Sequence, residues 1–206
     1  MKLPLFGLLT AAIAFGLDQL TKFYVTGPLA LNFEGLPARE LLPIFKVQYV
    51  ENHGISLSLL RADSGIANWL LNHFSQCLPA DTAIGFACRE SVVRWALVAM
   101  TSAIAVGILV WMAREPKRGD QIALGLVLGG ALGNIFDRAR LGYVVDFANL
   151  HFGDWSPFLV FNLGDAAITV GVLILLARAL LMRDKAPVGA PQATAGGNGS
   201  VENDNA

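Results

Sequence analysis

The chain has 206 residues, of which 54% are hydrophobic and 15% are charged. Soluble domains usually carry about 25% charged residues, and here the apolar residues fall in long runs, so we expect a membrane protein. The formal net charge of −1 gives no general basic surface for nucleic acid. The two cysteines, Cys77 and Cys88, and the three scattered histidines have no zinc-binding spacing, so we expect no metal site.

Four stretches are predicted to cross a membrane, namely residues 3–25, 95–112, 122–136 and 158–182. A helix needs about 20 residues to cross ~30 Å of hydrocarbon. The third stretch would reach only roughly 22 Å at 1.5 Å per residue. Its helix must therefore continue past the polar residues that follow it.

Basic residues in short segments predict the orientation. The loop 113–120 contains three of them, and others lie near both ends of the chain: Arg114, Lys117, Arg118, Lys2, Arg178, Arg183 and Lys185. Because cytoplasmic loops are enriched in Lys and Arg, we expect both termini in the cytoplasm. A cleaved signal peptide is the alternative for the first stretch, but no small-x-small cleavage site follows it.

The remaining segments lie outside the four stretches. Residues 44–50 alternate and are rich in β-formers, which predicts a strand, and residues 66–75 predict a short surface helix. We expect a single membrane-embedded domain over residues 1–184, with an outer insertion at about 61–91. Residues 185–206 are rich in Gly, Ala, Pro and Asn and are expected to form a disordered cytoplasmic tail.

Ionisable groups accompany the first and third stretches at membrane depth, where they are costly and are functional candidates. Asp18 and Lys22 share one helix face, and either a structural ion pair or a catalytic pair would explain them. Asn134, Asp137 and Arg138 also share a face, and a simple interfacial cap with Asp137 paired to Arg138 is the alternative to a functional cluster. Glycines at positions 125, 129 and 133 indicate close helix packing.

Two further carboxylates lie near apolar boundaries. Asp146 follows the third stretch in Tyr-Val-Val-Asp-Phe, and Asp165 comes one turn after Asn162 in the opening turns of the fourth. Two adjacent carboxylates that share one proton can act together as acid and base. Spacing alone does not bring them together, and two unrelated carboxylates remain the alternative.

Five motifs give the chain a resemblance to a known family. They are Asp18-Gln-Leu-Thr-Lys22, Asn52-His-Gly54, Gly129-Gly-Ala-Leu-Gly-Asn-Ile-Phe-Asp-Arg138, Gly142-Tyr-Val-Val-Asp-Phe147 and Phe161-Asn-Leu-Gly-Asp165. In this order they are similar to the motifs of the lipoprotein signal peptidases, also called signal peptidase II. No motif of a serine hydrolase, zinc protease or nucleotide-binding enzyme is present.

The resemblance implies an all-α membrane protein with four transmembrane helices and a small extracytoplasmic β-cradle. It implies an aspartic endopeptidase of the bacterial inner membrane that needs no cofactor, with its active site at the outer face. Its partners would be lipidated prolipoproteins and membrane lipids. Asp146 and Asp165 would be catalytic, and the substrate would be bound by five further residues: Asn52, Gly54, Asn134, Arg138 and Asn162. Asp18, Lys22 and Asp137 would be structural.

Three departures from the family pattern stand out, and one of them is the insertion at about 61–91, which the compact family members lack. Gly164 replaces the usual Ala and is expected only to loosen the start of the last helix, and the loop after Gly54 lacks the usual Ala-Phe. From the residues themselves we expect a disulfide between Cys77 and Cys88, with two free thiols as the alternative. An ion-coupled transporter and a non-catalytic scaffold are the rival functions, but a transporter should place its carboxylates near the midplane.

Overall fold

The computed structural model describes residues 3–54, 83–153 and 155–181. Within these ranges the chain forms four helices and three strands. In chain order they are α1 (Leu5–Thr26), β1 (Arg39–Leu42), β2 (Phe45–Asn52), α3 (Ala83–Arg114), α4 (Arg118–Arg140), β3 (Val144–Leu150) and α5 (Leu163–Leu181).

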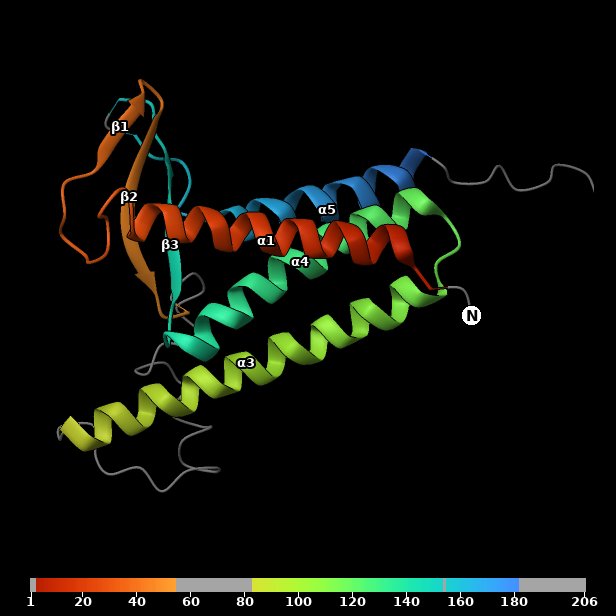
Figure 1. Cartoon of the computed structure of the whole chain (residues 1–206), viewed down its shortest axis with the longest axis horizontal. Coiled ribbons are helices and arrows are strands. Elements are labelled where there is room, and N and C mark those ends of the chain that lie inside the picture. Colours follow the sequence, from red (N-terminus) through yellow and green to blue (C-terminus); the bar gives the residue numbers. More distant parts are fainter. Residues whose placement is uncertain (1–2, 55–82, 154, 182–206) are drawn as a thin grey trace, which may run out of the picture.

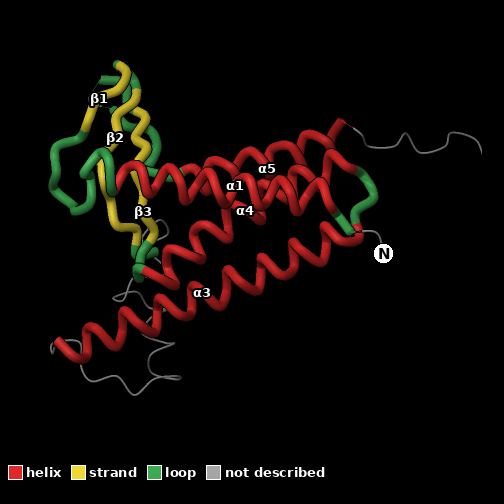
Figure 2. Tube along the Cα trace, in the orientation of Figure 1, coloured by secondary structure: helices red, strands yellow, loops and turns green. Residues whose placement is uncertain are grey.

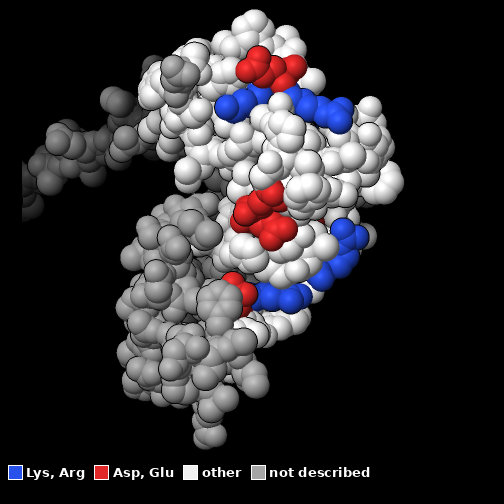
Figure 3. Space-filling view, turned by 90° about the vertical axis from the view of Figure 1, so that its left-hand side faces the viewer, with Lys and Arg blue, Asp and Glu red and all other residues white. Residues whose placement is uncertain are grey.

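The helices run back and forth in one bundle, and the small sheet covers one end of it (Figures 1 and 2). The beginning of α1, the turn between α3 and α4 and the end of α5 lie together at the opposite end (Figure 1). Seen from the sheet end, acidic and basic side chains lie in small separate groups on a mostly uncharged surface (Figure 3).

Three helices are long and apolar enough to cross a membrane, namely Glu90–Arg114, Arg118–Arg140 and Leu163–Leu181. The helix α1 has 22 residues, but it contains Asp18 and Lys22 and is not among the three. Apolar side chains on the outside of α1 and α5 are widely exposed, including Leu9, Leu20 and Leu173, as expected of surfaces that face lipid.

The helix boundaries differ from the predicted spans in two places. The helix α3 begins at Ala83, twelve residues before the predicted start at 95, because residues 89–94, which include Glu90 and Arg94, are too charged for a span but are compatible with a helix. The last helix begins at Leu163 and not at 158, because Phe161 exchanges two backbone hydrogen bonds with Ala148 of β3. The extension of α4 through Asp137 to Arg140 is confirmed.

Two other predictions fall outside the described residues. These are the helix at 66–75 and the tail at 185–206. The last part of the expected insertion, residues 83–91, belongs to α3. Cys88 is disulfide-bonded, whereas Cys77, the expected partner, lies outside the described residues.

The centre of the bundle is α4, which packs closely against α1 through its glycines. A Cβ added to Gly129 would lie 2.5 Å from the Ala11 carbonyl oxygen and 2.7 Å from the Ala14 Cβ. On the other side, a Cβ on Gly171 of α5 would lie 2.6 Å from the Ala123 carbonyl oxygen. The glycines therefore let neighbouring backbones approach one another, as their spacing predicted.

The three strands form an antiparallel sheet in the order β1-β2-β3, in which Val50 pairs with Asp146. Successive side chains of a strand point to opposite faces. One face packs into an apolar cluster that contains Val25, Val47, Tyr49 and Val145. Asp146 is on the opposite face, so the fold buries it against the helix ends.

We predict that Gly129→Ala lowers the melting temperature of the protein in detergent, because the added methyl group has no room between α1 and α4. Overpacking of this kind costs about 1–3 kcal/mol. The matched control is Gly16→Ala, where a Cβ would meet nothing within 4 Å, and which should keep or raise the melting temperature. Equal melting temperatures for the two variants would contradict the close helix contact.

Candidate active site

The two carboxylates that the sequence singles out are brought together by the fold. Asp146 comes from the middle of β3 and is only 2% exposed, and Asp165 comes from the first turn of α5. An asparagine side chain links them to one network. The Asn162 Nδ2 donates to Asp146 Oδ1 at 2.7 Å and to Asn134 Oδ1 at 3.1 Å, and the Asn134 Nδ2 donates to Asp165 Oδ1 at 2.8 Å.

Asp165 is held by the way in which α5 begins. Asn162 precedes the helix, and its Oδ1 accepts a hydrogen bond from the Asp165 backbone N–H at 2.9 Å. In return, Asp165 Oδ2 accepts one from the Asn162 backbone N–H at 3.2 Å. This reciprocal pair is a capping box. It orients both side chains independently of their contacts with the rest of the site.

Asp146 is held from β2. The Asn52 Nδ2 donates to Asp146 Oδ2 at 2.8 Å, and the Asn52 Oδ1 accepts from the Gly54 backbone N–H at 2.9 Å. Gly54 has φ +97°, and a Cβ there would lie 2.6 Å from Leu97 Cδ1 of α3. Glycine is therefore needed for the turn that orients Asn52.

Burial raises the pKa of Asp146 to about 6, and the negative charge of Asp165 contributes in the same direction. The hydrogen bonds from Asn52 and Asn162 oppose the shift because they favour the ionised form. Asp146 therefore keeps a proton up to about pH 6, whereas an ordinary aspartic acid loses it near pH 4.

Arg138 interacts electrostatically with both carboxylates, as well as with Asp137. Its Nε is buried and has no hydrogen-bond partner among the described residues. The alternative in which Asp137 simply pairs with Arg138 is wrong, because the two side chains form no hydrogen bond or ion pair with each other. Asp137 Oδ2 instead forms an ion pair with Lys22 Nζ at 2.8 Å and accepts from the Val145 backbone N–H at 3.3 Å.

Lys22 is the centre of a buried charge cluster behind the two carboxylates. Its Nζ lies 2.8 Å from Asp18 Oδ2, 2.8 Å from Asp137 Oδ2 and 3.3 Å from Asn134 Oδ1. An ammonium group has three donors and no acceptor, so these three oxygens match its full capacity. The contact with Asn134 helps to turn the amide nitrogen of that residue toward Asp165.

Asp18 ties the cluster to α5, because its Oδ1 accepts from the Gly164 backbone N–H at 2.8 Å. Gly164 therefore does more than loosen the helix start, as its Cβ would lie 3.0 Å from the Gly130 carbonyl oxygen and 3.2 Å from Asp18 Oδ1. The Ala of the family pattern would require these neighbours to move by a few tenths of an ångström.

Sequence reasoning did not single out Gln19. Its Nε2 donates to Asp18 Oδ2 at 3.1 Å and to Asp137 Oδ1 at 3.1 Å, so it bridges the two carboxylates that Lys22 neutralises. Its place between Asp18 and Lys22 within an apolar helix was the available signal. An uncharged amide at membrane depth also needs partners.

A sequence model described as "Signal peptidase (SPase) II" matches residues 10–80 and 79–181. The chain belongs to this family. Among its relatives, the lipoprotein signal peptidase of Sphingopyxis alaskensis is 50% identical over 181 residues, which is 88% of each chain. That of Rhizorhabdus wittichii is 49% identical over 174 residues, covering 84% of this chain and 85% of the relative.

Solved structures agree on the fold. A bacterial membrane enzyme determined by the in meso method matches with a TM-score of 0.61 and 20% identity, over 90% of this chain and 94% of that one. A second such structure matches with a TM-score of 0.58 and 22% identity, over 87% and 94%. The helical bundle with a small sheet at one end is thus a fold that this chain shares with solved bacterial membrane enzymes.

We predict that Lys22→Met greatly reduces the yield of folded protein. Asp18 and Asp137 are 0% and 1% exposed, and loss of the ammonium would leave both without their cation. Breaking a buried ion pair costs about 3–5 kcal/mol. The measurements are the monodisperse fraction and the melting temperature in detergent, with the exposed Lys117→Met as control. A Lys22→Met protein as stable as the control would refute the structural role.

Proposed function

We propose that this chain is an aspartic endopeptidase that removes the signal peptide of bacterial prolipoproteins. The cut lies on the amino side of the diacylglyceryl-modified cysteine. The observation that supports this best is the pair of carboxylates, Asp146 and Asp165, joined through asparagine amides at the sheet end of the bundle. Membership of the signal peptidase II family and the names of the relatives agree with it.

In the proposed reaction the pair holds one proton. Asp165, as carboxylate, removes a proton from a water molecule, and the water oxygen attacks the carbonyl carbon of the scissile peptide. Asp146 gives its proton to the carbonyl oxygen, which suits the raised pKa of its carboxyl group. Collapse of the tetrahedral intermediate breaks the C–N bond, and the amine leaves with a proton returned by the pair.

The neighbouring polar groups are suited to hold the substrate backbone. The proposed contacts are Asn52, Gly54, Asn134, Arg138 and Asn162. Arg138 fits this role because its guanidinium interacts electrostatically with both carboxylates. Its Nε makes no hydrogen bond within the described part of the chain. Asp18, Lys22 and Asp137 would support the site from behind.

An apolar cavity of about 410 Å³ reaches Asp165 from the side of the bundle. Its other walls come from β3, the segment after it and α5, with Leu150, Phe158, Leu159, Phe161, Ala166 and Val170. Phe158 and Leu159 are 60% and 72% exposed, so the cavity is open to the lipid phase. We propose that it receives an acyl chain of the modified cysteine, where each buried CH₂ adds about 0.8 kcal/mol.

The proposed topology has four spans. We include α1 because its apolar side chains are exposed along its length while Asp18 and Lys22 face α4 and are neutralised there. With the basic α3–α4 loop in the cytoplasm, both termini are cytoplasmic and the site lies at the outer face. The transporter alternative has no support in the family or in its relatives.

We expect Asp146→Asn and Asp165→Asn each to reduce cleavage of a lipidated prolipoprotein by at least about 100-fold, because an amide cannot exchange the proton. The assay uses purified protein in detergent, with the exposed Glu40→Gln as an amide control of unchanged activity. An unlipidated substrate should remain uncut by the wild-type protein. Near-normal turnover by either aspartate variant, or equal cleavage of both substrates, would reject the proposal.

The raised pKa of Asp146 predicts the pH dependence of the free enzyme. Below about pH 6 the carboxyl is protonated and can act as the acid, and above it this form is lost. We therefore expect kcat/KM to fall by up to about tenfold per pH unit above an apparent pKa near 6 that belongs to the pair. The melting temperature at each pH is the control, and a flat profile from pH 5.5 to 8 would contradict the assignment of the acid.

A further inference from the structure

The helix α3 is longer than a membrane span requires. Its 32 residues make a rod of about 48 Å, whereas the hydrocarbon is ~30 Å thick. Trp95 is half exposed, and the Arg94 guanidinium lies 5.2 Å from its ring centroid. Such a pair is typical of the membrane–water interface. The turns before it therefore stand outside the bilayer, and in Figure 1 this part of α3 extends as far as the sheet.

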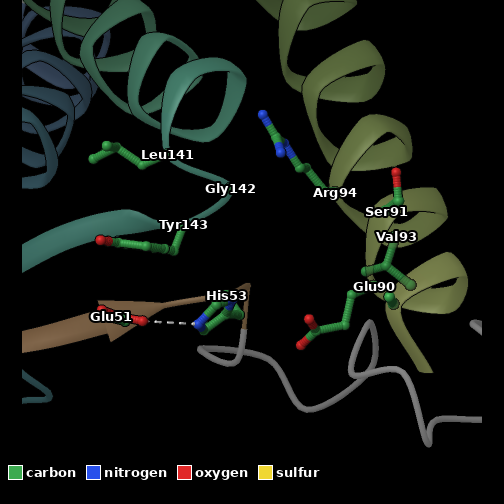
Figure 4. Close-up of a pocket in the computed structure, with 10 residues that line it drawn as sticks. Glu51, His53, Glu90, Ser91, Val93, Arg94, Leu141, Gly142 and Tyr143 are labelled. Atoms are coloured by element: carbon green, nitrogen blue, oxygen red, sulfur yellow. Dashed lines mark ion pairs between the residues drawn. The ribbon is translucent and has the colours of Figure 1, made fainter. Parts of the chain in front are cut away.

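A cavity of about 330 Å³ lies between these outer turns of α3, the end of β2 and the turn that joins α4 to β3. Most of the residues that line it are polar, and Figure 4 shows where they lie: Glu51, His53, Glu90, Ser91, Arg94 and Tyr143. None of these residues contributes to the proposed chemistry, so the cavity is a second polar site beside the first.

One short segment at the end of β2, residues 51–53, belongs to both sites. Asn52 donates to Asp146 on one face of the sheet, and its neighbours Glu51 and His53 line the cavity on the other. Adjacent Cα atoms are only ~3.8 Å apart. A peptide chain that leaves the carboxylate pair on the outer side would thus need only a few residues to reach the cavity.

The charged groups in the cavity differ in how firmly they are held. The Arg94 Nη2 donates to the Ala139 carbonyl oxygen at 2.5 Å. Glu51 accepts from the Tyr49 hydroxyl at 3.2 Å, and its other oxygen lies 3.4 Å from His53 Nε2.

Glu90 has no hydrogen bond or ion pair with another described residue, and Figure 4 shows its carboxylate turned toward the space beside His53. The described lining therefore offers two carboxylates against one guanidinium that is already bound to the protein.

We propose that this cavity binds the segment of the prolipoprotein that follows the modified cysteine, and that Glu90 and Glu51 select a basic side chain in it. The inference rests on the proposed function, because only cleavage at the carboxylate pair places that segment here. An ammonium or guanidinium group would supply the donor that Glu90 lacks among the described residues, and the flexible stem of Lys or Arg would cross the cavity.

The test uses diacylglyceryl-modified peptides in which a single Lys is moved through the first six positions after the cysteine, each compared with Gln at the same position. The purified full chain is assayed in detergent at low salt. We expect one position at which Lys raises kcat/KM over Gln by about fivefold, the size of an exposed ion pair, and at which added salt reduces the ratio.

Glu90→Gln should bring that Lys-to-Gln ratio close to one, and Glu90→Lys should reverse the preference toward a peptide with Glu. The exposed Glu40→Gln of β1 serves as the matched control and should keep the wild-type ratio. A ratio of one at all six positions, or a Lys preference that survives both Glu90 variants, would overturn the proposal. Failure of the proposed function would differ, because then no lipidated peptide would be cut at all.

Discussion

The buried ammonium group of Lys22 is the constraint on which the rest of the structure depends. It lies between the carboxylates of Asp18 and Asp137, both at 2.8 Å, and so joins α1 to α4 where water cannot screen the charges. From these two carboxylates the network continues through backbone N–H groups to Gly164 and Val145. One charge cluster therefore positions the first residues of α5 and of β3. These two elements carry Asp165 and Asp146.

The sequence predicted the local part of this cluster well. Asp18 and Lys22 lie four residues apart on one helix, so their ion pair follows from helix geometry alone, and the shortness of the apolar run before Asp137 required α4 to continue. The contact between Lys22 and Asp137 joins residues more than 100 positions apart, and no periodicity encodes it. Asp137 was therefore given its neighbour Arg138 as an alternative partner, which the hydrogen bonds do not support.

The starts of α5 and α3 differ from the predicted ones for two reasons. A contact with the sheet delays the start of α5, and charged residues extend α3 beyond the membrane span. Residues 158–161 are apolar enough for a span, but the bridge between Phe161 and Ala148 extends the sheet to them, and the helix begins only after Asn162. Residues 89–94 of α3 carry too many charges for a span yet remain helical. The capping box of Asn162 and Asp165 was visible in the sequence as Asn-x-x-Asp, and it marks the true start of α5.

The carboxylate pair accepts its hydrogen bonds from neutral donors, and the Lys22 ammonium is separated from Asp165 by Asn134. Asp146 and Asp165 accept hydrogen bonds from asparagine amides and a backbone N–H, none of which titrates. Lys22 reaches Asp165 only through Asn134, and its charge is the smallest of the effects that act on the pKa of Asp146, where burial dominates. An ammonium placed directly on either carboxylate would favour the fully ionised pair. Asn134 thus lets a strong charge cluster fix the geometry while one proton stays available for the proposed reaction.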